Sequence, residues 1–280
     1  MKKFLVLTDF SEISMMANHY AIQLASIIHA EVHFMHIIMT AVDWFTLSRS
    51  NNLSSPNIRQ SIETAEQKLM ELTQQANKLG ISSRFNIAYN RPNFDFTNHI
   101  NSSDYFDLTI TGSHGASGLK ELFIGSNAQK IIRYSLNPVL VIKEMPKRII
   151  PDNMVFISLF KRCDLKAFTK LMSIANTFGA RVKLLYIQTP FQRENKRDVE
   201  KRIMSFLNKL SIKNLDYHIE FGKWSEEGVK DYINKNSPSL VAISTEGRKG
   251  LARFRKPSFA ENLVNHISIP IISILKQEAF

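Results

Sequence analysis

The sequence of 280 residues contains a single cysteine, Cys163, which excludes an internal disulfide and a metal site built from several cysteines. It also lacks the uninterrupted run of about 18 to 20 apolar residues that a membrane-spanning helix requires. The N-terminal residues reach a carboxylate at Asp9, too early for the apolar segment of a secretory signal peptide. From these absences we expect a cytoplasmic protein without a membrane segment.

Positive charge is concentrated in the second half of the chain. Residues 1–143 hold 12 lysines and arginines against 11 acidic residues, whereas residues 144–280 hold 24 against 14. A hydrophobic fraction of 44% with 22% charged residues is that of an ordinary soluble globular protein. The length favours two domains over one.

Apolar runs alternate with helical periodicity, and this order occurs twice. In the first half, strands are predicted at residues 3–8, 31–38, 82–88, 106–111 and 137–143, with helices at 13–28, 58–79, 94–101 and 126–136. In the second half, strands are predicted at residues 154–159, 181–187, 215–221, 239–244 and 269–275, with helices at 165–178, 199–210, 229–233 and 258–266. Such alternation predicts right-handed βαβ units and parallel sheets.

Matching positions in the two halves keep a regular distance. Pro138 and Pro270 are 132 residues apart, and Asp9 and Leu159 are 150 apart. The difference of 18 residues is explained if the second half lacks most of the loop at residues 42–57. We therefore expect two copies of one domain. The predicted boundaries are 1–143 for the first repeat, 144–153 for a linker with two prolines, and 154–280 for the second repeat.

A glycine-rich stretch follows the fourth predicted strand of the first repeat. Gly112, Gly115 and Gly125, followed by Ser126, have the spacing Gly-x2-Gly-x9-Gly-Ser, which is neither of the common phosphate-loop patterns. Glycine can take positive φ and has no Cβ, so backbone N–H groups there can approach a phosphate at a helix N-terminus. Residues 126–129 also fit a capping box, which leaves a purely structural role open.

Asp9 follows the first predicted strand. In open α/β sheets ligands bind beyond the carboxyl ends of the strands, so this carboxylate faces the expected ligand crevice. An equal alternative is that Asp9 caps the next helix, for which Ser11 is the other candidate. His33 and His36 lie in the second predicted strand, and we interpret them as ordinary packed or hydrogen-bonded histidines.

The second repeat has lost most of these features. Leu159 replaces Asp9, Ser244 replaces Gly112, and Pro257 replaces Gly125. Proline removes a backbone N–H, which harms a loop that binds phosphate through such groups. Because the second repeat is expected to fold without the carboxylate and without two of the glycines, their presence in the first favours ligand binding there.

The glycine spacing resembles the ATP-binding signature of the universal stress protein family. With Asp9-Phe-Ser in the first turn and Asn137-Pro-Val-Leu-Val-Ile in the last strand, the resemblance covers essentially the whole chain as a tandem of two domains. It implies an α/β fold of two five-stranded, parallel, Rossmann-like domains. It also implies that residues 139–141 pair with residues 271–273 in an intrachain pseudo-dimer, a pairing that protects both sheet edges. Whether two chains pair further is left open.

The resemblance also assigns the ligand site. It implies that Asp9 and Ile37 contact the adenosine, while the glycine loop holds the ribose and phosphates. Leu7 stands where some ATP-binding members have proline. The residues predicted to bind nucleotide are Asp9, Ile37, Gly112, Ser113, Gly115, Gly125, Ser126 and Asn127.

We expect an ATP-binding stress-response protein that acts as a binding module or switch. No catalytic residue is assigned: His114 is the nearest candidate, but side chains within a phosphate-wrapping turn usually point away from the ligand, and at most slow ATP hydrolysis is expected. ADP or AMP is an alternative ligand, and Mg²⁺ would be held mainly by phosphates. A hypothesis of another class is that the basic stretch at residues 248–256 docks an anionic partner, a nucleic acid or an acidic protein. A solvated loop is the structural alternative.

Overall fold

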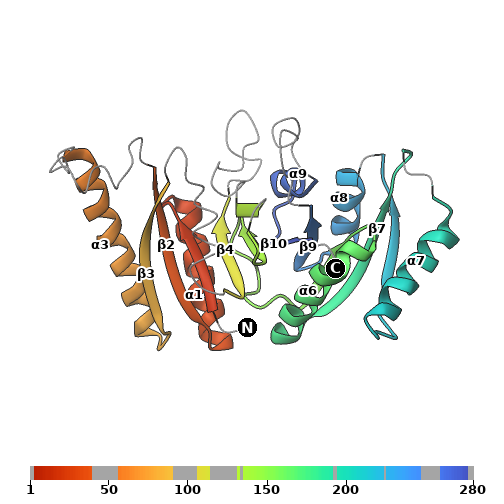
Figure 1. Ribbon diagram of the computed structural model, residues 1–280, viewed down its shortest axis with the longest axis horizontal. Helices are drawn as coiled ribbons and strands as arrows, with labels where there is room; N and C mark the ends of the chain where they lie inside the picture. The colour runs from red at the N-terminus through yellow and green to blue at the C-terminus, as the bar shows by residue number, and fades with distance from the viewer. Residues whose placement is uncertain are drawn as a thin grey trace. The chain divides into compact units, whose positions relative to one another are not determined.

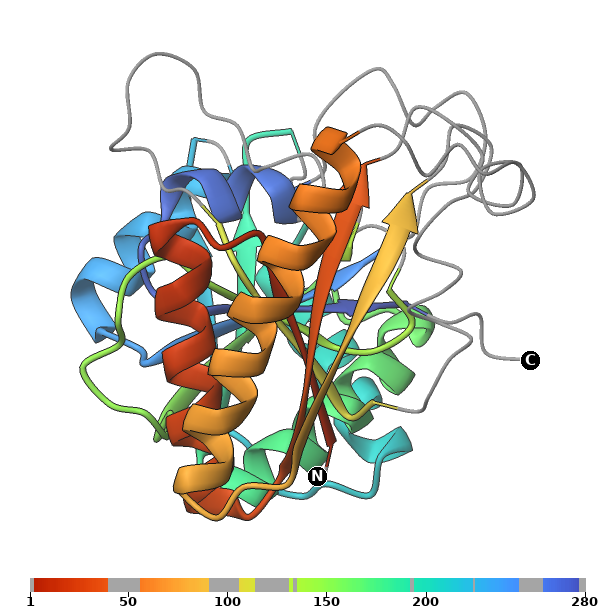
Figure 2. The same cartoon turned by 90° about the vertical axis from the view of Figure 1, so that its left-hand side faces the viewer.

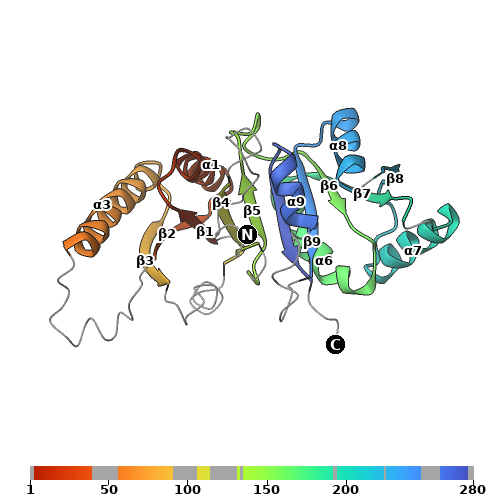
Figure 3. The ribbon, with the colours of Figure 1, turned by 90° about the horizontal axis from the view of Figure 1, so that it is seen from above.

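The computed structural model describes residues 3–39, 56–90, 106–113, 131–132, 135–191, 194–223, 225–246 and 259–276. The chain divides into two compact units, Met1–Gly112 and Ser113–Phe280. Figures 1 and 3 together label their strands and helices. No helix in the described ranges is long and apolar enough to cross a membrane.

The first unit contains a parallel sheet with the strand order β3-β2-β1-β4. Its strands are β1 (Lys3–Thr8), β2 (Glu31–Met39), β3 (Ser83–Asn90) and β4 (Leu108–Gly112). Helices α1 (Glu12–Ile28) and α3 (Pro56–Lys78) cover the same face of this sheet (Figures 2 and 3). Residues 4–8 of β1 are all buried, as expected for a strand covered on both faces.

The second unit contains a sheet with the order β5-β10-β9-β6-β7-β8. Its strands are β5 (Val139–Ile142), β6 (Asn153–Ile157), β7 (Arg181–Gln188), β8 (Tyr217–Phe221), β9 (Leu240–Thr245) and β10 (Ile271–Leu275). All neighbouring pairs are parallel except β5 with β10.

The four helices described below lie on two faces of that sheet in the second unit. A 3-10 turn, Arg162–Asp164, leads into α6 (Leu165–Phe178), which shares one face with α7 (Lys196–Lys209). The other face carries α8 (Ser225–Asn236) and α9 (Phe259–His266), as Figure 3 shows. The order β6-α6-β7-α7-β8 repeats the order β1-α1-β2-α3-β3 of the first unit, so the predicted α/β repeat is confirmed.

The predicted pairing of the two last strands is also confirmed, and its direction is antiparallel. Ile271 faces Val141, and Ser273 faces Val139. Because β5 hydrogen-bonds to β10, it is grouped with the second half of the chain, and the units divide after Gly112. The repeat boundaries at residues 143 and 154 stay a prediction. The predicted helix at residues 94–101 lies outside the described residues, as does most of the one at 126–136.

Two lysines add hydrogen bonds near this strand pair. Lys143, which is only 6% exposed, donates from Nζ to the carbonyl of Ile267 at 2.7 Å. Lys170 donates from α6 to the carbonyl of Leu136 at 2.8 Å. Burial lowers the pKa of Lys143 to about 8, although Glu144 acts in the opposite direction. Each bond joins residues of one sequence repeat to residues of the other.

Candidate functional site

Three of the predicted site residues lie together at the carboxyl ends of the strands of the first sheet. Thr8 of β1 pairs with His36 of β2, and Leu7 of β1 pairs with Thr111 of β4. This register places Asp9, Ile37 and Gly112 at the neighbouring carboxyl ends of β1, β2 and β4, about 4.8 Å from strand to strand. Asp9 is exposed and Ile37 is half-buried. These strand ends are therefore where an open α/β sheet would bind a ligand.

The turn after β1 fixes the carboxylate of Asp9. Its Oδ1 accepts hydrogen bonds from the N–H of Ser11 at 3.0 Å and from the hydroxyl of Ser11 at 2.6 Å. Ser11 is the N-cap of α1, and its Oγ accepts from the N–H of Ser14. Ser11 is thus confirmed as the cap, and Asp9 supports it from outside the helix.

These hydrogen bonds set the charge of Asp9. Partial burial would raise the pKa of its carboxyl group, but the bonds from Ser11 outweigh this and hold the pKa below its usual range. At neutral pH the side chain is a carboxylate, which can only accept hydrogen bonds. It can therefore bind a hydroxyl or amino group of a ligand.

An aromatic pair lies beside this carboxylate. Phe10 adopts the left-handed φ of 63°, and its ring centroid is 4.6 Å from that of His36. The Nζ of Lys68 lies 5.1 Å from the centroid of the Phe10 ring. His36 donates from Nδ1 to the carbonyl of Thr8 at 2.8 Å, because a carbonyl oxygen can only accept. The interpretation of His36 as a hydrogen-bonded histidine is confirmed.

The sequence prediction did not include this aromatic pair. A signal for Phe10 exists in the repeat, because Phe160 stands 150 residues later with a φ of 54°. Each phenylalanine N–H donates to the hydroxyl two residues earlier, at 3.2 Å to Thr8 and 2.9 Å to Ser158. The shared geometry shows that both repeats keep the same strained turn.

Gly112 is required by close packing. A Cβ at this position would lie 2.7 Å from the carbonyl oxygen of Ile13 and 2.9 Å from the backbone nitrogen of Ser14. Within the described ranges, only Gly80 and Gly179 are glycines with positive φ, so the expected freedom of φ is not what Gly112 supplies. Its absent side chain lets the end of β4 touch the first turn of α1.

The remaining predicted residues receive less structural support. Ser113 is 3% exposed, and its N–H donates to the carbonyl of Ile142 at 3.0 Å. Its hydroxyl has no hydrogen-bond partner in the part of the chain that the structure describes. Four other predicted residues and His114 lie outside the described residues: Gly115, Gly125, Ser126 and Asn127.

The equivalent strand ends of the second repeat contain a buried ion pair. Asp164, at the position equivalent to Ser14, is 0% exposed and lies 3.2 Å from the Nζ of Lys276. It accepts hydrogen bonds from the N–H of Lys161 at 2.9 Å and from the hydroxyl of Ser244 at 2.8 Å. Ser244 is the counterpart of Gly112. Its hydroxyl contacts Asp164 at the start of α6, whereas Gly112 contacts the start of α1 with its backbone alone.

Lys276 is held charged in this cluster. Its Nζ is also 3.3 Å from Glu246. Burial would lower the pKa of Lys276, but the carboxylates of Asp164 and Glu246 outweigh that effect and raise the pKa above its usual value. The side chain of Lys276 therefore neutralises the second repeat's buried carboxylate from within the chain.

Comparison with known proteins agrees with this architecture. The model of the universal stress protein family matches residues 1–143 and 154–274. The chain belongs to the universal stress protein family, with two such domains in tandem.

Two curated relatives have about the length of one domain. Universal stress protein YxiE of Bacillus subtilis (strain 168) is 30% identical over 147 residues, which cover 50% of this chain and 98% of the relative. Universal stress protein MJ0577 of Methanocaldococcus jannaschii is 30% identical over 158 residues, which cover 51% of this chain and 94% of the relative.

A solved structure matches the full chain. The universal stress protein from Archaeoglobus fulgidus DSM 4304 has a TM-score of 0.76 and 17% sequence identity, and the match covers 98% of each chain. At this identity the likeness concerns the fold alone.

Proposed function

We propose that this universal stress protein binds one adenine nucleotide, ATP, through its first domain. The observation that carries the proposal is the ionised carboxylate of Asp9 at the carboxyl edge of the first sheet, beside Ile37 and Gly112. Strand ends of this kind are where open α/β sheets bind ligands. The glycine spacing that follows β4 supports ATP, because it resembles the family's ATP-binding signature.

Each residue has a role suited to its chemistry. The carboxylate of Asp9 accepts from a hydroxyl or amino group of the nucleoside, and half-buried Ile37 offers an apolar surface to it. Backbone N–H groups at Gly115 and Gly125 bind phosphate, together with the N-terminal dipole of the helix predicted to begin at Ser126. Ser113, whose N–H already donates to Ile142, contributes its hydroxyl, which has no partner among the described residues. Bound Mg²⁺ is held mainly by the phosphates.

The second domain supports the proposal of a single site. Leu159 stands in place of Asp9, so the strand ends of the second domain lack the carboxylate that would accept a hydrogen bond from a nucleoside. The ion pair of Asp164 and Lys276 satisfies the charges that remain there. The two domains, at residues 1–143 and 154–280, form an intrachain pseudo-dimer through β5 and β10.

Calorimetric titration of nucleotide-stripped protein with ATP and Mg²⁺ tests the proposal. We expect binding in the wild type and its loss in a Gly115→Val, Ser126→Ala double variant, because a side chain and a missing hydroxyl both disturb the loop. The matched control is Gly247→Val, Ser258→Ala, which makes the same changes in the second repeat. Equal loss of binding in both variants would contradict a site in the first domain. A parallel titration with AMP and ADP identifies the preferred nucleotide.

A further inference from the structure

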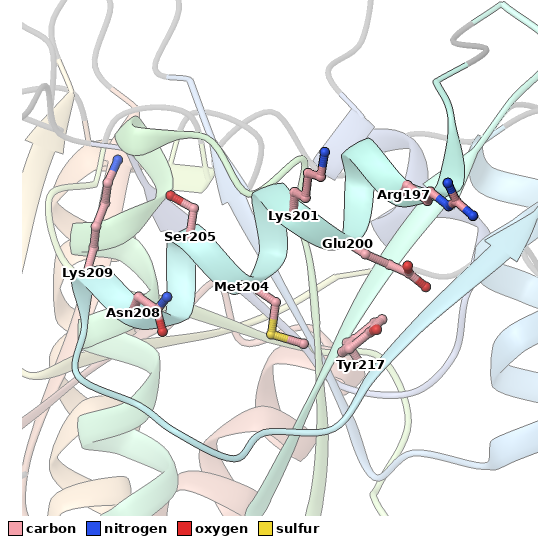
Figure 4. A pocket seen from close by; sticks show the side chains of 8 residues that line it. All are labelled: Arg197, Glu200, Lys201, Met204, Ser205, Asn208, Lys209 and Tyr217. Atoms are coloured by element: carbon pink, nitrogen blue, oxygen red, sulfur yellow. The ribbon is translucent and has the colours of Figure 1, made fainter.

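An open groove lies along the outer side of the second unit. It has a volume of about 780 Å³, and helix α7 supplies seven of its eight lining residues. Tyr217, the first residue of β8, supplies the eighth and faces the helix across the groove (Figure 4). The groove shares no residue with the proposed nucleotide site.

The lining residues of α7 form two rows along the helix, since residues four apart lie on the same side. One row carries Arg197, Lys201 and Lys209, which together span about 18 Å at 1.5 Å per residue. The other row includes Glu200 and Met204, and Figure 4 shows Met204 pointing toward Tyr217. The groove therefore combines a basic row with an apolar patch.

Carboxylates in the described part of the chain do not neutralise the charge of the basic row. Among the described residues, no ion pair joins Arg197, Lys201 or Lys209 to a carboxylate. The one acidic lining residue, Glu200, already lies 4.0 Å from the Nζ of Lys196. By contrast, Arg202 on the same helix is bound to Glu194 and has its charge satisfied there. The three cations remain available to a partner.

The apolar part of the groove is also accessible. Met204 is 45% exposed, so a partner can reach its side chain. Tyr217 is half-buried and presents its ring to the same hollow. Methionine adapts its shape to varied apolar side chains, so this pair suits an inserted apolar residue.

We propose that this groove docks an acidic peptide segment of a partner protein. Carboxylates of the segment pair with Arg197, Lys201 and Lys209, and an apolar side chain of the segment contacts Met204 and Tyr217. Charge complementarity favours an acidic partner, because the second half of the chain holds 24 basic residues against 14 acidic ones. A nucleic acid fits less well, since its continuous phosphates would meet Glu200 and find only three cations along about 18 Å.

Fluorescence anisotropy with the full chain, in the absence of ATP, tests the proposal. The probe is a labelled 20-residue peptide in which glutamate and leucine recur at helical spacing. In Arg197→Glu, Lys201→Glu, Lys209→Glu we expect at least tenfold weaker binding. The matched control is Lys78→Glu, Lys147→Glu, Lys230→Glu, which changes the net charge equally and also places one substitution in the last turn of a helix. We expect this control to bind within twofold of the wild type.

Further arms test the kind of partner and the folding of the variants. Met204→Gln should weaken binding of the leucine-containing peptide and leave binding of poly-glutamate unchanged. The milder Arg197→Gln, Lys201→Gln, Lys209→Gln variant, checked by circular dichroism, should also lose affinity. Unchanged binding in either triple groove variant, or equal weakening in the control, would overturn the proposal. Displacement of the peptide by equimolar oligo-dT would assign the groove to nucleic acid and overturn it as well.

Discussion

Lys143 gives the stability of the protein an uncommon dependence on pH. The side chain is almost fully buried at the pairing of β5 with β10 and donates to the carbonyl of Ile267. Burial lowers its pKa from 10.5 to about 8, against the opposing effect of Glu144. In the unfolded chain the pKa returns to its ordinary value, so the two states bind different numbers of protons between these limits.

Proton linkage determines whether the free energy of unfolding rises or falls with pH. Between pH 8 and 10.5 the unfolded chain binds more protons at Lys143 than the folded chain, so the free energy of unfolding rises with pH. At about 1.4 kcal/mol per pKa unit, the effect reaches at most about 3 kcal/mol, of which about 2 kcal/mol develops between pH 8 and 10. Lys170, whose pKa burial also lowers, acts in the same direction. Buried Tyr20, whose pKa burial raises, acts above pH 10 and in the opposite direction.

Urea unfolding at pH 7, 8, 9 and 10 measures this effect in the wild type and in Lys143→Met. The wild type should gain about 2 kcal/mol relative to the variant between pH 8 and 10, because methionine keeps the apolar length and removes the titrating group. Lys147→Met, at an exposed lysine, is the control and should follow the wild type. A constant difference between wild type and Lys143→Met, or one of opposite sign, would refute the reasoning.

Three further predictions concern packing, the buried ion pair and the ligand. Gly112→Ala should lower the free energy of unfolding by about 1 to 3 kcal/mol, because the new Cβ meets backbone. Gly228→Ala in helix α8 should cost less in the same urea assay, because the gain in helix propensity offsets part of the clash between the new Cβ and the Cγ2 of Ile187, 2.8 Å away. Asp164→Asn should cost about 2 to 4 kcal/mol in thermal unfolding because it removes the buried carboxylate beside Lys276 and leaves that lysine only the exposed Glu246, and a cost below 1 kcal/mol would show that the pair is unimportant. Asp9→Asn should weaken ATP binding about tenfold, the effect of one charge-assisted hydrogen bond, while circular dichroism stays unchanged.

Much of the fold is predictable because the signals are local. Strands buried on both faces, such as residues 4–8, read as continuous apolar runs, and turns and helices separate them. The pairing of β5 with β10 could be predicted from the family resemblance and from the need to cover two apolar edges. The antiparallel direction of that pairing was found only in the structure.

The details at the carboxyl ends of the strands in the two repeats depend on contacts between residues that are distant in the sequence. Gly112 is required by Ile13, which lies about 100 positions earlier, so no local pattern distinguishes packing from ligand approach. The sequence predicts only a loss of site residues in the second repeat, whereas the structure shows an ion pair between Asp164 and Lys276 there. Neither residue is unusual in its own sequence context, and only the fold brings them together.

We propose one nucleotide site in a chain with two homologous domains. Native mass spectrometry of the intact protein with ATP and Mg²⁺ counts bound nucleotides directly. We expect one ATP per chain in the wild type and none in Gly115→Val, Ser126→Ala. Two nucleotides per chain would contradict the proposed loss of the site in the second domain. No bound nucleotide at millimolar ATP would contradict the proposed function itself.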